Sequence, residues 1–377
     1  MSPDVRGGLS LGRRLWRIVA ASIAVVGSPG VVVAAVFVVA AVTGRGIAAG
    51  VAGLCIAAAC WRSAFSRSRR HDVVAAAFFA GAVVIVAALV ALAPRAPSRS
   101  SSLRSVWSTE PPTSSPFWFV PEVDQVGAGL VVAAFVDPFI TVTDAVRIRG
   151  DVARVYADVD KDLGQDAVGS AIPAMVGGPS AWHRFEVWPH DGSPPRKALV
   201  FLHGSGANFL AYAWLFQALA DEFKMLVILP SFGAGNWHND GGVDVIEGAR
   251  DVARAAGVAQ DAILVGGLSN GGRGVTRAFR AHPDHWAGLI FLSAVVEEDV
   301  VGDAAGCSAA GTKPVLFVHG GRDNRVAKDG AAAAVARYAA AGCAVTSIVD
   351  DDEDHFWWFH NPAAVGAALR VFFAAQP

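Results

Sequence analysis

The chain has 377 residues, more than one enzyme domain needs, and a formal net charge of −2. A charge so close to zero gives no support for nucleic-acid binding. Hydrophobic residues make up 53% of the chain, which is high for an ordinary soluble domain. The excess lies in the first hundred residues, so two unlike parts share one chain.

Three apolar segments in the N-terminal part are interpreted as membrane spans, at about residues 18–42, 47–61 and 73–93. A helix needs ~20 apolar residues to cross a bilayer, and the first and third segments are long enough. The second is short and spans only if Arg45 and Arg62 reach the two interfaces.

The arginines predict how these spans are oriented. Four precede the first segment and four fill the loop before the third, whereas Arg45 alone lies between the first two. By the positive-inside rule, the N-terminus and the arginine-rich loop are cytoplasmic. We therefore expect a multi-pass protein whose C-terminal part is on the outer or periplasmic side. A cleaved signal peptide is the weaker alternative, because further apolar segments follow.

Two segments separate the membrane part from the rest. Residues 94–116 are rich in Pro and Ser and predict a flexible linker. Residues 117–181 contain an apolar run at 126–136, too short to span, and a possible amphipathic helix or strands at 145–162. We favour an N-terminal extension that packs on the following domain. The alternative is a cap over an active site.

From residue 182 to 377, short apolar runs alternate with helical segments. This pattern predicts an α/β fold, a mainly parallel sheet with helices on both faces. The expected strands lie at residues 185–188, 198–202, 225–229, 262–265, 288–292, 315–318 and 345–349. In such a sheet the functional site lies at the carboxyl ends of the strands, so polar loops that follow a strand are the candidates.

The sequence Gly-Gly-Leu-Ser-Asn-Gly-Gly at 266–272 follows one expected strand and precedes a helical segment. A serine between glycines at a strand-to-helix turn has the form of a nucleophile elbow, because so tight a turn needs flanks without side chains. Ser269 is the candidate nucleophile. A second match around Ser10 has no strand before it and is discarded.

The loop that begins at His203 follows the strand at 198–202. Its small residues allow a backbone N–H to point into the site. Together with the N–H of Asn270, this group would form an oxyanion hole. Ser205 is the first choice of donor and Gly206 the second, while His203 is expected to brace the loop.

Two further loops supply an acid and a base. Asp323 follows the strand at 315–318 and is the candidate acid, the alternative being a helix N-cap or a solvated loop residue. His355 follows the last strand and is the candidate base. Taken alone, either residue is more often structural than catalytic, and only their joint order along the chain favours the catalytic interpretation.

Aromatic residues near these loops suggest a substrate pocket. Trp237, Phe356 and Trp357 would form an apolar wall, or alternatively pack the last helix onto the sheet. Arg273 and Arg322 would bind an anionic group, or else be surface charges.

The order of these loops resembles the α/β-hydrolase superfamily, in its esterase and lipase type. The resemblance rests on His-Gly-Ser-Gly at 203–206, Gly-Leu-Ser-Asn-Gly at 267–271, His-Gly-Gly-Arg-Asp at 319–323 and Asp-His-Phe at 354–356. It covers about half the chain, residues 182–377, and implies an α/β-hydrolase fold there and a carboxylic ester hydrolase with a Ser-His-Asp triad, needing no cofactor and no metal. The apolar segments separately predict about three transmembrane helices before this domain, and hence a membrane-anchored enzyme. Its partners would be the bilayer and a small-molecule or lipid ester.

One departure from that superfamily concerns the lid. Only residues 293–312 are available after the strand at 288–292, so any lid is small. A peptidase or an acyltransferase of the same fold and a non-catalytic scaffold stay open as alternatives. So does a disulfide between Cys307 and Cys343, against two free thiols.

Overall fold

The computed structural model describes residues 28–65, 69–91, 102–109, 120–163, 182–206, 208–297, 307 and 312–376. The chain divides into two compact units. One comprises residues 1–95 and 119–132, and the other comprises residues 96–118 and 133–377.

The first unit is helical. Its elements are α2 (Ser28–Ala40), α3 (Gly44–Phe65), α4 (Arg69–Ala91) and the larger part of α5 (Glu122–Val136). α3 packs against both α2 and α4. The buried carboxylate of Asp124 accepts the backbone N–H groups of Val42 at 2.6 Å and Thr43 at 3.0 Å. It thereby satisfies donors at the start of α3 that the helix itself leaves unpaired.

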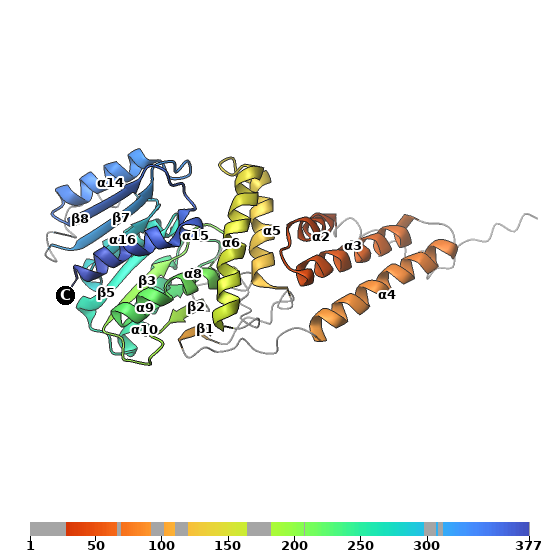
Figure 1. Ribbon diagram of the computed structural model, residues 1–377, viewed down its shortest axis with the longest axis horizontal. Helices are drawn as coiled ribbons and strands as arrows, with labels where there is room; N and C mark the ends of the chain where they lie inside the picture. The colour runs from red at the N-terminus through yellow and green to blue at the C-terminus, as the bar shows by residue number, and fades with distance from the viewer. Residues whose placement is uncertain are drawn as a thin grey trace, which may run out of the picture. The chain divides into compact units, whose positions relative to one another are not determined.

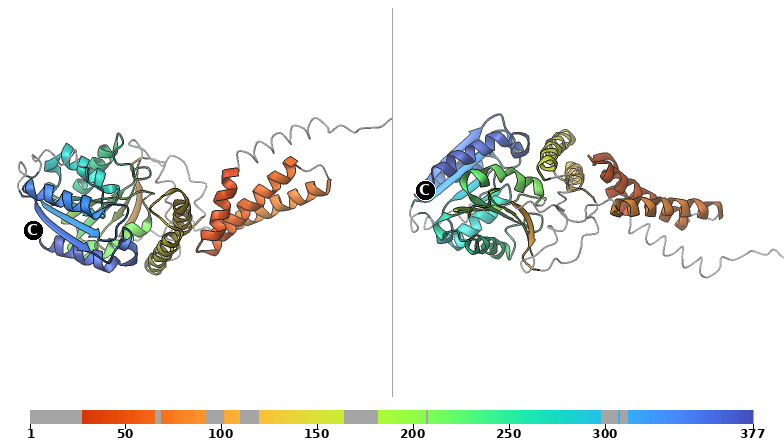
Figure 2. Two further views of the ribbon diagram at one scale, coloured as in Figure 1. Left: turned by 90° about the horizontal axis from the view of Figure 1, so that it is seen from above. Right: turned by 60° about the horizontal axis from the view of Figure 1, so that its bottom comes forward.

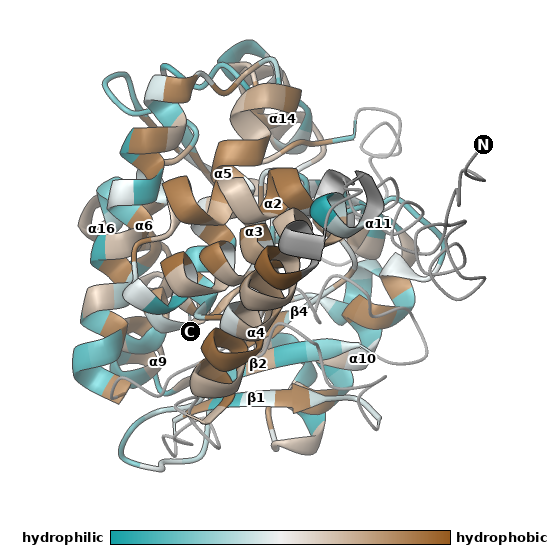
Figure 3. Ribbon diagram, turned by 90° about the vertical axis from the view of Figure 1, so that its right-hand side faces the viewer, coloured by the Kyte–Doolittle hydropathy of each residue, from teal (hydrophilic) through white to brown (hydrophobic). Residues whose placement is uncertain are grey.

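Two helices of this unit are long and apolar enough to cross a membrane, at Gly44–Ser63 and Val73–Ala91. Figure 3 shows apolar residues along most of α4. The second expected span is longer than its apolar run, because the helix continues through the arginines at both ends. The first expected span is described only from Ser28, as the 13-residue α2. Residues 18–27 lie outside the described residues.

The second unit is built on an eight-stranded sheet of order β1-β2-β4-β3-β5-β6-β7-β8. The strands are β1 (Leu103–Trp107), β2 (His183–Val187), β3 (Lys197–Leu202), β4 (Met225–Pro230), β5 (Ile263–Leu268), β6 (Leu289–Leu292), β7 (Pro314–Gly320) and β8 (Ala344–Asp350). β1 and β2 are antiparallel to their neighbours and the other strands are parallel. The α/β fold with a mainly parallel sheet is thus confirmed.

Helices cover both faces of this sheet (Figures 1 and 2). They are α8 (Leu210–Leu215), α9 (Gln217–Phe223), α10 (Gly242–Ala255), α11 (Gly271–Ala281), α14 (Lys328–Ala340), α15 (Trp357–His360) and α16 (Pro362–Ala374). β3 shows why both faces need cover, since it is buried along its length. Val200 packs with α10 and α11, while Phe201 on the opposite face meets Phe216 and Trp358.

The expected linker contains a strand of the sheet. Residues 103–107 form β1, which pairs with β2 so that Leu103 faces Val187 and Trp107 faces His183. Pro and Ser around this short run predict a flexible segment, and the pairing that makes it a strand comes from residues about 80 positions away. The second unit therefore includes residues well before 182.

The segment at 145–162, for which helix and strands were both open, is the helix α6 (Val142–Leu163). It packs against α8 and α15. The side chains on its buried face are Ala145, Ile148, Val152, Val155, Tyr156 and Val159. This part of the N-terminal extension packs on the sheet unit, as expected.

The buried cysteines Cys307 and Cys343 form a disulfide, with their Cα atoms 5.3 Å apart and a sequence separation of 36. A cross-link of that span restricts the unfolded chain by about 3–4 kcal/mol. We therefore expect Cys307→Ala with Cys343→Ala to lower the free energy of unfolding by about 3 kcal/mol.

Denaturant unfolding of the full chain checks this expectation. Reductant should destabilise the wild type and leave the double variant unchanged. Replacement of the free cysteines Cys55 and Cys60 is the matched control. Equal stability of wild type and double variant would show that the disulfide contributes nothing.

Candidate active site

Ser269 lies in the turn between β5 and α11 and has a positive φ of 52°. A non-glycine residue rarely adopts this conformation, and such strain often marks a functional position. The neighbouring β6 region holds it in place. Ser269 N–H donates to the Leu292 carbonyl at 3.2 Å, and Val295 N–H donates to the Ser269 carbonyl at 2.9 Å.

The glycines beside Ser269 are required by close backbone contacts. A Cβ on Gly267 would lie 2.5 Å from the carbonyl carbon of Gly271. A Cβ on Gly271 would lie 2.2 Å from the carbonyl oxygen of Leu202. Only residues without side chains fit, which is the reason the elbow sequence has glycine at these positions.

The structure brings Ser269, His355 and Asp323 into one chain of hydrogen bonds. Nδ1 of His355 lies 2.7 Å from Oδ2 of Asp323, and Nε2 lies 3.0 Å from Oγ of Ser269. A carboxylate only accepts, so Nδ1 carries the proton, and in the neutral ring Nε2 accepts from the serine hydroxyl. All three residues are buried. This is the arrangement of a nucleophile, a base and an orienting acid.

Asp323 is held as a carboxylate. Burial raises its pKa, but hydrogen bonds from His355 and from two backbone N–H groups outweigh burial, so the pKa lies below its usual value. The backbone donors are Arg325 N–H at 2.9 Å and Val326 N–H at 2.8 Å, both to Oδ1. They leave Oδ2 directed at the imidazole.

The loop after β3 passes directly beside the serine. A Cβ on Gly204 would lie 3.0 Å from Cβ of Ser269. Gly206 N–H donates to the Ala234 carbonyl at 3.0 Å. The group that was the second choice as oxyanion-hole donor is therefore already hydrogen-bonded. Ser205 and Asn270 both line the cavity above Ser269, and Nδ2 of Asn270 donates to Oγ of Ser205 at 2.7 Å.

His203 braces this loop from behind. Its Nδ1 donates to the Gly204 carbonyl at 2.8 Å, and its Nε2 accepts Phe232 N–H at 3.2 Å. Because both ring nitrogens are engaged in this way, the imidazole is neutral. Burial lowers its pKa to about 4.

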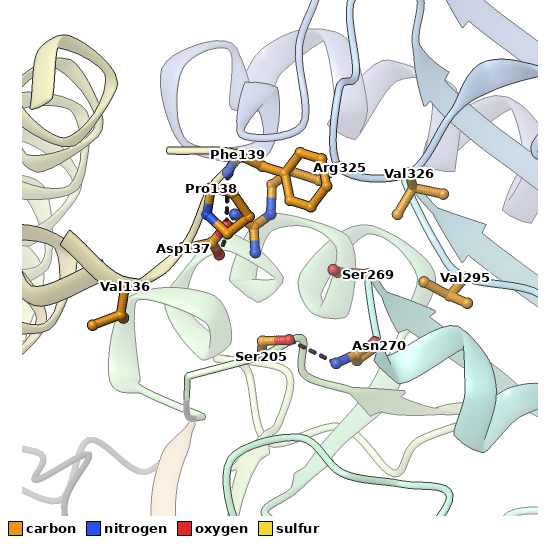
Figure 4. A pocket seen from close by; sticks show the side chains of 10 residues that line it. All are labelled: Val136, Asp137, Pro138, Phe139, Ser205, Ser269, Asn270, Val295, Arg325 and Val326. Atoms are coloured by element: carbon orange, nitrogen blue, oxygen red, sulfur yellow. Dashed lines mark hydrogen bonds and ion pairs between the residues drawn. The ribbon is translucent and has the colours of Figure 1, made fainter. Parts of the chain in front are cut away.

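A cavity of about 470 Å³ opens above Ser269. Figure 4 shows residues 136–139 on one side of it and Ser205 with Asn270 on the other. Its lining residues are Val136, Asp137, Pro138, Phe139, Ser205, Ser269, Asn270, Val295, Arg325 and Val326. The turn between α5 and α6 thus lies at the mouth of the site. Of the two roles considered for residues 117–181, a cap over the site fits this turn, and packing on the following domain fits α6.

The expected aromatic wall does not line this cavity. Trp237 is fully buried and packs in the core, where its Nε1–H donates to the His203 carbonyl at 2.9 Å. Trp357 is buried in α15. Phe356 stacks edge-on against His355, with ring centroids 5.2 Å apart. The position of these rings after strands could not distinguish a packing role from a pocket wall.

Arg322 and Arg273, the two arginines considered from the sequence, each pair with a carboxylate. Arg322 forms an ion pair with Asp352, and Arg273 lies 3.7 Å from Glu297. Instead, Arg325 enters the cavity wall. The sequence offered one signal for it, its position two residues after Asp323, but gave no basis for choosing it over Arg322.

α6 also holds the loop that carries His355. Arg147 forms an ion pair with Asp354, next to the imidazole, and its Nη1 lies 3.4 Å from Nδ1 of His360. At the other end of α6, Trp214 Nε1–H donates to Asp162 at 2.9 Å.

A possible metal-binding group lies outside the cavity. Among the described residues, Glu247, His282 and His285 present ligand atoms within 4.8 Å of one another. Glu247 already accepts from His285 at 2.8 Å and pairs with Arg250 at 2.7 Å. The Arg250 guanidinium neutralises the Glu247 carboxylate, so Glu247 is paired without a metal ion.

No protein-family model and no curated protein matches the sequence. Among solved structures, the chain is similar to Est1E from Butyrivibrio proteoclasticus, at 18% identity and a TM-score of 0.42, covering 52% of this chain and 94% of that one. It is also similar to esterase PE8, at 17% identity and a TM-score of 0.41, covering 50% of this chain and 97% of that one.

A third similar structure is FphF, a fluorophosphonate-binding serine hydrolase of Staphylococcus aureus. Its identity is 17% and its TM-score 0.42, covering 51% of this chain and 92% of that one. The chemistry of the site accordingly rests on this chain's own residues.

Two of the buried histidines, His203 and His183, predict how stability depends on pH. Burial lowers the pKa of His203 to about 4 and that of His183 to about 3. Between those values and about 6.5, the unfolded chain binds protons that the folded chain does not. Stability should therefore fall as pH falls below 6.5, by about 1.4 kcal/mol per pH unit for each histidine.

Denaturant unfolding at pH values from 4 to 8 measures this slope. His203→Gln should reduce this slope by the contribution of one histidine. His238→Gln, at an exposed position, should leave the slope unchanged. An unchanged slope in His203→Gln would mean that His203 is protonated in the folded protein.

Proposed function

We propose that this protein is a serine hydrolase, acting on carboxylic esters through an acyl-enzyme. The observation that carries the proposal is the position of His355, hydrogen-bonded both to Ser269 at 3.0 Å and to Asp323 at 2.7 Å beneath an open cavity. Ser269 has the strained φ of a nucleophile in a tight turn, and Asp323 remains a carboxylate. Each requirement of nucleophilic catalysis thus has a residue to meet it.

In the proposed reaction, Oγ of Ser269 attacks the ester carbonyl as Nε2 of His355 takes its proton. Asp323 keeps the imidazole in the required tautomer and stabilises its protonated form. Ser205 and Asn270 N–H groups bind the oxyanion, each lowering the barrier by ~3 kcal/mol. The alcohol leaves with the proton from His355. His355 then takes a proton from water as the water attacks the acyl-enzyme, and it passes that proton to Oγ of Ser269 as the carboxylic acid leaves.

The same geometry disfavours a non-catalytic scaffold. A scaffold needs no strained serine, and nothing would keep the three side chains aligned over 86 residues of sequence. A peptidase or an acyltransferase would use the same triad with a different acceptor or leaving group. We place the ester first because the cavity is open and lies beneath a short turn between two helices.

The test is labelling with a fluorophosphonate probe, combined with hydrolysis of neutral aryl esters by the full chain. Ser269→Ala and His355→Ala should abolish labelling and lower kcat/KM at least about a thousandfold. Asp323→Ala should cost somewhat less, because the base and nucleophile remain.

Ser347→Ala and Asp352→Asn are matched controls on exposed positions of β8 and the loop that follows it. Both should label and hydrolyse like the wild type. A folded wild type that neither labels nor hydrolyses esters would favour the scaffold.

We further propose that the first unit anchors the protein in a membrane with the hydrolase unit on the outer side. The two long apolar helices and the arginine distribution support an anchor of this orientation. The Cys307–Cys343 disulfide supports the side, because disulfides persist outside the reducing cytoplasm.

Trapping thiols in intact cells tests this placement. With a membrane-permeant alkylating reagent, Cys307 and Cys343 should stay unmodified until reductant is added. Protease added outside the cells should also digest the hydrolase unit. Free thiols at both positions, together with protection from protease, would place the unit in the cytoplasm.

A further inference from the structure

The cavity wall carries an ion pair between Arg325, in the loop of the acid, and Asp137, in the turn between α5 and α6. Nη1 of Arg325 lies 2.7 Å from Oδ2 of Asp137. Figure 4 shows the guanidinium extending into the cavity beside Asp137 and above Ser269, with Ser205 and Asn270 on the far side. A substrate whose carbonyl sits at Ser269 therefore has a cation within the same cavity.

Arg325 is held rigidly in this position. Its backbone N–H is bound to Asp323 at 2.9 Å, and its guanidinium lies 5.7 Å from the ring centre of Phe356. The side chain is only 16% exposed. A guanidinium fixed by the loop of the catalytic acid keeps its place when the contents of the cavity change.

The contact between the two side chains leaves hydrogen-bonding capacity on the arginine. Nη1 is buried and lies 2.7 Å from Oδ2 of Asp137, its ion-pair partner among the described residues. A guanidinium offers five donors in a planar fork that suits two carboxylate oxygens at once. The contact with Asp137 is made through this one nitrogen, and the fork has further donors.

Asp137 is the more exposed of the two partners. It lies in a turn, its side chain is 23% exposed, and its Oδ1 accepts Phe139 N–H at 2.9 Å. Burial raises its pKa, but the Phe139 N–H and the Arg325 charge outweigh burial and hold the pKa below its usual value. The group facing Arg325 is thus an ionised carboxylate that has access to water.

We propose that Arg325 determines substrate specificity by binding a carboxylate carried by the ester, and that Asp137 holds the arginine between turnovers. This inference rests on the proposed ester hydrolase. The substrate carboxylate replaces that of Asp137, which turns to water, so Arg325 is never left buried without a counter-charge. A monocarboxylate fits a wall with one arginine better than a dianionic phosphate does.

The competing explanation is that the ion pair only fastens the turn at 136–139 to the acid loop. The two explanations differ for variants that break the pair. If the pair is only a fastening, Arg325→Met and Asp137→Asn each change kcat/KM by the same factor for charged and neutral esters. As a specificity device, they shift the preference for anionic esters in opposite directions, because one removes the binding cation and the other removes its internal competitor.

The experiment compares kcat/KM of the full chain, in neutral detergent, for pairs of esters that carry either a free carboxylate or its methyl ester. One pair is 4-acetoxybenzoate and its methyl ester, with the charge on the leaving group. The other is the 4-nitrophenyl monoester of glutaric acid and its methyl ester, with the charge on the acyl group. The preference ratio within each pair is the readout, and labelling by a neutral fluorophosphonate reports the triad independently.

In the wild type, the carboxylate ester of at least one pair should be preferred about tenfold or more. Arg325→Met should bring that ratio close to one while labelling persists, and Arg325→Lys should retain part of it. Asp137→Asn should raise it. Arg322→Met, in the same loop but paired with Asp352 at the surface, should match the wild type.

Two results would overturn the inference alone, with labelling intact. One is a wild type without charge preference in either pair. The other is a shift of the ratio in the same direction in Asp137→Asn and Arg325→Met. Loss of labelling together with no hydrolysis of any ester would instead overturn the proposed function, and this inference with it.

Discussion

The tight turn between β5 and α11 is the constraint on which the site depends. Ser269 has a φ of 52°, a conformation that costs about 1–3 kcal/mol outside glycine. The surrounding structure offsets this cost through hydrogen bonds to the Ser269 backbone from the β6 region and from Gly272 N–H at 3.0 Å. The strain places the hydroxyl above the sheet edge, where only a group from another strand end can reach it.

The turn alone gives a serine without activation, and the sheet supplies the rest. β7 and β8 are parallel neighbours, so the loops after them, with Asp323 and His355, leave the same edge of the sheet. Asp323 is fixed by its own loop's N–H groups. The imidazole position is therefore decided by two adjacent strand ends, and its tautomer by a carboxylate that stays charged.

The turn and helix before the sheet connect to both of these loops by charge. Asp137 pairs with Arg325 in the loop after β7, and Arg147 on α6 pairs with Asp354 in the loop after β8. Both contacts join residues about 190 to 210 positions apart. A segment without catalytic groups of its own thus borders the cavity and contacts both loops that serve the serine. That placement is why the proposed specificity device lies here.

The sequence by itself determined the elements with local signals. Alternating apolar runs and helical segments predicted the parallel sheet, because burial on both faces leaves a pattern within each strand. The glycines at 266–272 marked the turn at Ser269, because their requirement is steric and local. The apolar runs at 47–61 and 73–93 likewise predicted two long apolar helices, although α3 extends beyond its run.

Only the tertiary structure decided what depends on partners distant in sequence. β1 is a strand because β2 pairs with it, and nothing within residues 103–107 indicates that partner. Trp237 and Trp357 are core residues, and Arg325 rather than Arg322 faces the cavity. In each case residue type was uninformative, because the same side chain can be buried, exposed or functional. The direction in which it points is decided by the packing of elements far apart in the chain.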